Sequence, residues 1–113
     1  SADRELAENL LVNPADIKIH LLYGVILNNL AILTENNEYF LRAEKILQEA
    51  LKYSPKRQQI FYDLANIKIK LAKYDEAIQL LQTCLNFDMQ IEESWLRLKA
   101  AKQAKEQSQV LIK

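Results

Sequence analysis

The residues of this chain that could perform chemistry are few and stand far apart in the sequence. His20 is the only histidine and Cys84 the only cysteine among 113 residues. A nucleophilic cysteine needs a base or a cation that lowers its pKa, and no histidine lies near Cys84 in the sequence. One cysteine also excludes an internal disulfide and a cysteine zinc cluster. We predict that Cys84 is a buried thiol and that His20 is a packed or surface residue.

Two pairs of adjacent carboxylates could in principle act as acid and base. These are Asp75-Glu76 and Glu92-Glu93, and each is expected in the first turn of a helix. Acidic side chains there complement the helix dipole, which explains them better than catalysis does. The single glycine, Gly24, cannot form a phosphate-binding loop. We therefore predict that the chain is not an enzyme and holds neither a metal nor a cofactor.

The composition favours an all-α fold. Half of the residues are hydrophobic, and one glycine and two prolines leave little turn chemistry for a β-rich fold. The 15 basic and 15 acidic residues balance, whereas a nucleic-acid-binding domain usually carries a basic excess. The longest apolar stretch, 21–33, is shorter than the ~20 residues that span a membrane. We expect no nucleic-acid partner and no membrane span.

Apolar and small residues recur at an offset of 34 positions, the signature of a repeat array. The matching sets are Leu27, Phe61 and Trp95; Leu30, Leu64 and Leu98; Ala31 and Ala65; Phe40 and Tyr74; Ala43 and Ala77; Leu47 and Leu81; Ala50 and Cys84. Each unit contains two helical runs, which in the second unit cover 58–71 and 75–87. The equivalence predicts that Trp95 is a core residue and not an exposed stacking platform.

Proline marks two of the expected helix starts. We predict Ser54 as an N-cap with Pro55 as the first helical residue, and Asn13 as the cap of an earlier helix that begins near Pro14. Folding alone gives no reason for Lys56, or for Arg57 beside it, at that helix start.

The first unit departs from the repeat in length. Its apolar pattern runs unbroken over 17–33, about two turns longer than the repeat requires. One more helix is expected over 3–12 and a last one over 92–113. The sequence thus predicts about six antiparallel helices.

The period and its large, small and proline positions resemble the tetratricopeptide repeat, most closely in "FYDLANIKIKLAKYDEAIQLLQTCLNFDMQ". The resemblance implies one α-solenoid domain over 1–113. Its parts are an N-terminal helix and helix extension in 1–23, repeats at 24–57 and 58–91, and a partial or capping repeat in 92–113. It also implies a non-catalytic module that binds a peptide segment or partner domain on the concave face of its first helices.

Candidate partner-binding residues are those on the first helices that the core does not need. They are Asn28, Asn29 and Ile32 in the first unit, Gln59, Tyr62, Asp63, Asn66 and Lys70 in the second, and Arg97, Lys56 and Arg57 at the margins. Amides can pair with a peptide backbone, and Tyr62 would offer contact area. The family's carboxylate clamp does not fit, because only Arg97 matches it, whereas Asp63 and Glu93 would repel a carboxylate.

Two further interpretations concern context. The stretch "NPADIKIHLLYGVILNNLAILTENNEYFLRAEKILQEALKYSPKRQQIFYDLA" resembles the tail of bacterial O-antigen ligase-like or polymerase-like membrane proteins. That resemblance implies an accessory extracytoplasmic domain whose enzyme lies elsewhere; without it, a cytoplasmic adaptor is expected. The last three apolar residues, Val110-Leu111-Ile112, could instead cap the array, fray or pair between chains, so we expect a monomer or weak dimer.

Overall fold

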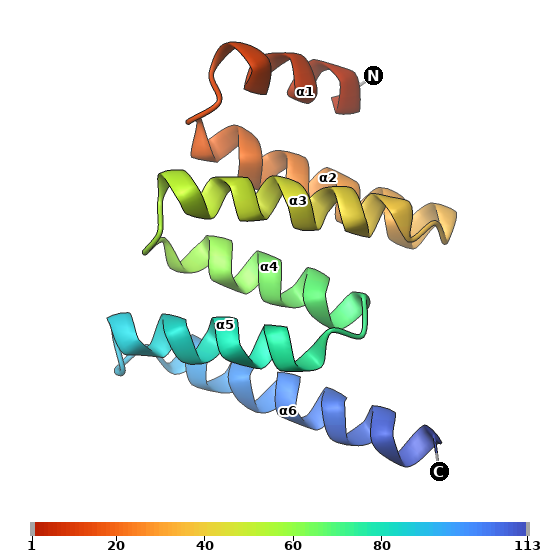
Figure 1. Ribbon diagram of the computed structural model, residues 1–113, viewed down its shortest axis with the longest axis vertical. Coiled ribbons are helices and arrows are strands. Elements are labelled where there is room, and N and C mark those ends of the chain that lie inside the picture. Colours follow the sequence, from red (N-terminus) through yellow and green to blue (C-terminus); the bar gives the residue numbers. More distant parts are fainter. Residues whose placement is uncertain (1, 113) are drawn as a thin grey trace.

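The computed structural model describes the backbone of residues 2–112 and the side chains of residues 2–110, and within this part the chain forms six helices and no strand. The helices are α1 (Ala2–Val12), α2 (Ile17–Thr34), α3 (Glu38–Tyr53), α4 (Gln58–Lys70), α5 (Tyr74–Phe87) and α6 (Glu92–Ile112). They stack in chain order (Figure 1). The predicted all-α architecture of six helices is confirmed.

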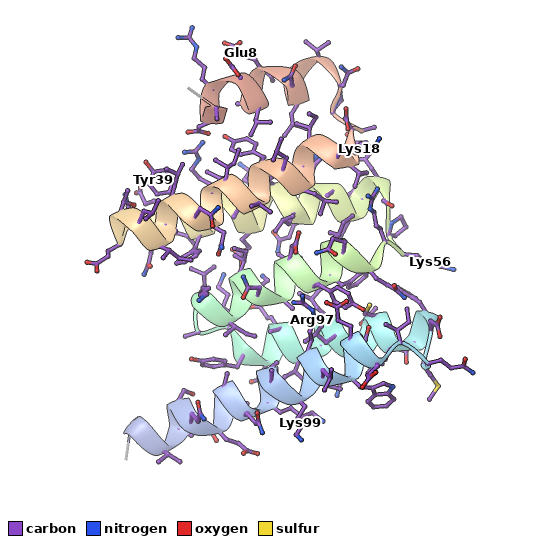
Figure 2. The ribbon with its side chains drawn as sticks, turned by 180° about the vertical axis from the view of Figure 1, so that it is seen from behind. Glu8, Lys18, Tyr39, Lys56, Arg97 and Lys99 are labelled. Atoms are coloured by element: carbon purple, nitrogen blue, oxygen red, sulfur yellow. The ribbon has the colours of Figure 1, made fainter. Side chains whose placement is uncertain are left out.

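The helices form two layers in a flat body of 44 × 34 × 17 Å. Each helix packs on the next, and α4 also contacts both α2 and α6, whereas the backbones of α3 and α5 are not in contact. In Figure 1 α3 and α5 lie in front of α2 and α6, and the reverse view in Figure 2 brings α2 and α6 forward. We call the surface formed by α2, α4 and α6 the inner face.

The prolines act in turns before the helices and not as first helical residues. The Arg57 N–H donates to the Ser54 carbonyl (3.4 Å) and the Asp16 N–H to the Asn13 carbonyl (3.1 Å). Each proline thus stands second in a four-residue turn, where its fixed φ is favoured. The predicted caps were wrong.

Ser54 caps the other end of a helix, and other residues are the N-caps of α4 and α2. Ser54 ends α3, and its N–H donates to the Ala50 carbonyl. Arg57 is the N-cap of α4 and makes no side-chain capping bond. The N-cap of α2 is Asp16, whose Oδ1 accepts a hydrogen bond from the Ile19 N–H (3.3 Å).

The lengthening of the first helix pair is real and is shared by both of its helices. α2 has 18 residues against 13 in α4, and α3 has 16 against 14 in α5. α1 packs beside this longer helix pair. The Asp3 carboxylate of α1 accepts hydrogen bonds from Tyr23 of α2 and Arg42 of α3. On the inner face α2 is therefore longer than α4, and α6 is longer still, with 21 residues.

α2 is the one helix of the described residues that is long and apolar enough to cross a membrane. The prediction of no membrane span considered only residues 21–33, whereas the apolar helix covers Ile17–Thr34. Core helices of soluble proteins, which are mostly buried, meet the same criterion, whereas 28% of α2 is buried, along one side that includes Leu27 and Ala31. The finding is weak evidence for a span.

Equivalent positions of the two helix pairs are buried, as the 34-residue offset predicts. They include Leu27 and Phe61, Ala43 and Ala77, and Leu47 and Leu81. Trp95 breaks the series, because its side chain is 47% exposed and its indole N–H donates to the Met89 carbonyl (2.7 Å). No helix of the described part covers α6 as α3 covers α2, so the prediction of a core tryptophan was wrong.

Candidate partner-binding face

The residues first considered for catalysis are structural in their surroundings. His20 is buried, with Nδ1 2.7 Å from the Asp16 carbonyl and its ring near that of Tyr53. Cys84 is buried, and its Sγ atom lies 3.6 Å from the Ser94 Oγ atom. The carboxylate pairs stand in the first turns of α5 and α6. No group of His, Cys, Asp and Glu among the described residues is arranged to hold a metal ion.

A small cavity opens between α2 and α4 on the inner face. Its volume is about 80 Å³, and it is lined by Gly24, Val25, Asn28, Asp63, Asn66 and Ile67. Three of the predicted partner-binding residues, one from α2 and two from α4, thus lie around a single site. We call it the α2–α4 cavity.

The polar groups around the α2–α4 cavity are poorly paired. The Asn28 Oδ1 atom is buried and has no hydrogen-bond partner among the residues that the structure describes. Asp63 accepts one hydrogen bond, from the Gln59 Nε2 atom (2.8 Å) to Oδ1. Its burial raises the pKa of the Asp63 carboxyl, and the Gln59 hydrogen bond and the nearby Arg97 charge only partly oppose this. An unsatisfied acceptor and a half-buried carboxylate share one site.

An exposed apolar stripe runs along α2 beside the cavity. Leu22, Val25 and Ile32 are each about half exposed, and Leu33 more so. Leu22, Ile32 and Leu33 lie three, seven and eight residues from Val25, so all four lie on one side of the helix. Asn29 is exposed on the same side. The inner face therefore pairs an apolar surface on α2 with polar side chains on α4.

Tyr62 does not lie open on the inner face as predicted. Its side chain is 3% exposed, and its hydroxyl lies 2.6 Å from the Ser94 Oγ atom. The Arg97 guanidinium covers the ring at 4.6 Å from its centre and pairs with Glu93 (3.0 Å). Figure 2 shows Arg97 between α4 and α6, with Lys99 on the opposite side of α6. Tyr62 and Arg97 therefore join α4 to α6.

The remaining predicted residues take separate places. Gln59 is exposed and orients Asp63, while Lys70 is exposed at the far end of α4 and does not line the cavity. The structure thus brings together Asn28, Asp63 and Asn66. Sequence reasoning missed Val25, whose place on the same side of α2 as Ile32 was the signal available.

The sequence pattern also did not predict a buried ion cluster. Its central residue, Lys68, has the spacing of a core residue, and that spacing does not reveal its charged partners. Its ammonium lies 2.6 Å from Glu44 and 3.1 Å from Glu76, and Lys73 lies 2.8 Å from Glu44. Burial alone would raise the pKa of Glu44, but hydrogen bonds from both lysines lower it overall. For Lys68 burial is likewise outweighed, and its pKa is raised. This cluster joins α3, α4 and α5.

Comparison with known proteins supports the repeat. A model of the family described as tetratricopeptide repeat matches residues 40–102, which is more than half of the chain. No curated protein matches the sequence, and the predicted link to O-antigen ligase-like proteins has no support. Tetratricopeptide repeats generally mediate protein–protein interaction and are typically non-catalytic. By its stacked helix pairs and this match, the chain belongs to the tetratricopeptide repeat family.

Proposed function

We propose that the chain binds a peptide segment of a partner protein along the inner face formed by α2, α4 and α6. The observation that carries the proposal is the α2–α4 cavity beside the exposed stripe of α2: Asn28 lines this cavity, and its buried Oδ1 atom has no partner among the described residues. A buried polar atom left unpaired costs about 1–3 kcal/mol. A bound segment that donates a hydrogen bond there would remove that cost.

The two walls of the inner face suit an extended or helical segment. Asn66 and Asn28 offer amide groups that can pair with backbone or side-chain donors and acceptors. Val25, Leu22 and Ile32 offer apolar area that is now in contact with water, and covering it would favour association. Specificity would come from the polar groups and affinity mainly from the apolar ones.

The experiment compares two matched substitutions on opposite layers. Val25 on α2 is 47% exposed and Leu41 on α3 is 48% exposed, so arginine at either position should leave the fold intact. Peptides are selected from a random dodecamer display library on the wild-type domain, and their affinities are then measured for all three proteins.

We expect Val25→Arg to weaken the selected peptides at least tenfold and Leu41→Arg to change them less than twofold. Far-UV circular dichroism and melting curves check that both variants remain folded. Peptides that bind Val25→Arg as well as they bind the wild type would show that the inner face is not the binding surface.

A further inference from the structure

We propose that the inner face selects segments in which a lysine or arginine stands among aliphatic residues, with Asp63 as the group that binds the cation. The inference rests on the proposed function and names the chemistry of its ligand. It concerns the α2–α4 cavity, which Asp63, Asn28 and Asn66 line together.

Asp63 has no cationic partner within the described part of the chain. Its Oδ1 accepts from Gln59, which is neutral, and its Oδ2 makes no hydrogen bond there. Arg97 is the basic residue that most affects it, but the Arg97 guanidinium is engaged by Glu93 and lies over the Tyr62 ring. One carboxylate oxygen therefore remains available to a ligand.

The surroundings of Asp63 favour a cation over an anion or a neutral group. The carboxylate is partly desolvated, and a positive charge at hydrogen-bond distance would compensate the lost hydration. Asn28 and Asn66 line the same cavity, and their amide oxygens are further acceptors. An ammonium has three N–H donors and a guanidinium five, so either could use several of these acceptors together. An acidic side chain would meet repulsion from Asp63.

The stripe on α2 determines what should flank the cation. Val25 lines the cavity and also belongs to the exposed stripe with Leu22 and Ile32. A segment whose basic side chain enters the cavity therefore lays its neighbouring side chains on aliphatic surface. Leucine, isoleucine or valine next to the lysine or arginine fits this surface, whereas a uniformly charged segment does not.

The test uses the same random dodecamer library, with a charge-matched control. Asp63→Asn keeps the shape of the side chain and removes its charge. Glu38→Gln removes one negative charge from an exposed position on α3, which is not part of the inner face. Peptides selected on the wild type are synthesised, and their affinities are measured for the wild type and both variants.

We expect the selected peptides to be enriched in lysine or arginine next to aliphatic residues. Their affinity should fall at least tenfold in Asp63→Asn and less than twofold in Glu38→Gln. Selection without basic residues, or equal losses in the two variants, would overturn the inference.

The Val25→Arg variant separates the two proposals. If it abolishes binding while Asp63→Asn does not, the inner face binds peptides but Asp63 does not select a cation. If neither variant weakens binding, the proposed function fails together with this inference.

Discussion

Polar groups are paired in one region of the molecule and poorly paired in another. The first region is the ion cluster of Glu44, Lys68, Lys73 and Glu76, and the second is the α2–α4 cavity. In the cluster, Glu44 is bonded by two lysines, and the nearly inaccessible Lys68 has two carboxylates. In the cavity, within the described part of the chain, the Asn28 Oδ1 atom has no hydrogen-bond partner and Asp63 has only the neutral Gln59. Both sites contain a carboxylate shielded from water, so burial alone does not make them different.

The pKa directions express that difference. Burial would raise the pKa of both carboxyls, but lysine hydrogen bonds reverse the direction for Glu44 and no cation does so for Asp63. A lowered carboxyl pKa means that ionisation favours the folded state, and a raised one means that ionisation opposes it. We infer that the ion cluster stabilises the fold. The polar groups of the cavity do not, and we infer that they are suited to bind a ligand.

Among the substitutions that change stability, breaking the ion cluster should give the largest loss. Glu44→Ala leaves the Lys68 ammonium, which is 4% exposed, with only the more exposed Glu76. We expect a loss of about 3 kcal/mol in the free energy of unfolding, since removing one member of a buried ion pair strands the other charge. Urea denaturation at neutral pH measures it.

The matched control is Glu49→Ala on the same helix, which breaks an exposed pair with Lys52. That substitution should change stability by less than about 0.5 kcal/mol. A Glu44→Leu/Lys68→Met double variant should recover much of the loss, because no buried charge is left unpaired. Equal effects of Glu44→Ala and Glu49→Ala would contradict the structural role of the cluster.

Tyr62→Phe should have an intermediate effect. It removes the hydroxyl that is 2.6 Å from Ser94 and keeps the buried ring beneath Arg97. We expect a loss of about 1 kcal/mol, the typical net contribution of one buried hydrogen bond. Thermal unfolding should show the loss, while peptide affinity should stay within twofold of the wild type. A large loss of affinity without a change in stability would return Tyr62 to the binding surface.

Asp63→Asn should give the smallest stability effect, with the opposite sign. Because the folded-state pKa of Asp63 is raised, its ionised form destabilises the fold at neutral pH, and the asparagine variant should melt slightly higher there. The difference should shrink as pH falls through the folded-state pKa of Asp63, because protonation removes the unfavourable charge.

A Glu44→Gln variant gives the matching contrast in pH dependence. The stabilisation by Glu44 should be present above the ordinary carboxyl pKa and should be lost as pH falls through its lower folded-state value. Melting curves of both variants and the wild type between neutral and acidic pH measure the two trends. A lower melting temperature for Asp63→Asn at neutral pH would contradict the comparison.

The helices and half of the site were accessible from sequence because both depend on local periodicity. Positions spaced three and four apart, repeated at an offset of 34, indicated the helix pairs and their buried residues. The same spacing identified Asn28, Asp63 and Asn66 as residues outside the core. Those residues meet because first helices lie next to each other in a stacked array.

The errors came from contacts between residues far apart in the chain. Tyr62 is buried because Ser94 and Arg97 of α6 cover it, and Trp95 is exposed because no helix of the described part covers α6 there. Lys68 had the spacing of a core residue, but the spacing could not reveal that Glu44 on the preceding helix would neutralise it. Proline in a turn and proline at a helix start differ by two or three residues, which periodicity does not resolve.

The most direct test of the account is a double-mutant cycle between Asp63 and the basic residue of a selected peptide. Four affinities are measured, for wild type and Asp63→Asn, each with the selected peptide and with its lysine replaced by glutamine. If the two groups bind each other, each single change should weaken binding about tenfold and the two together should weaken it little further. Independent losses that multiply to about a hundredfold would contradict cation binding by Asp63.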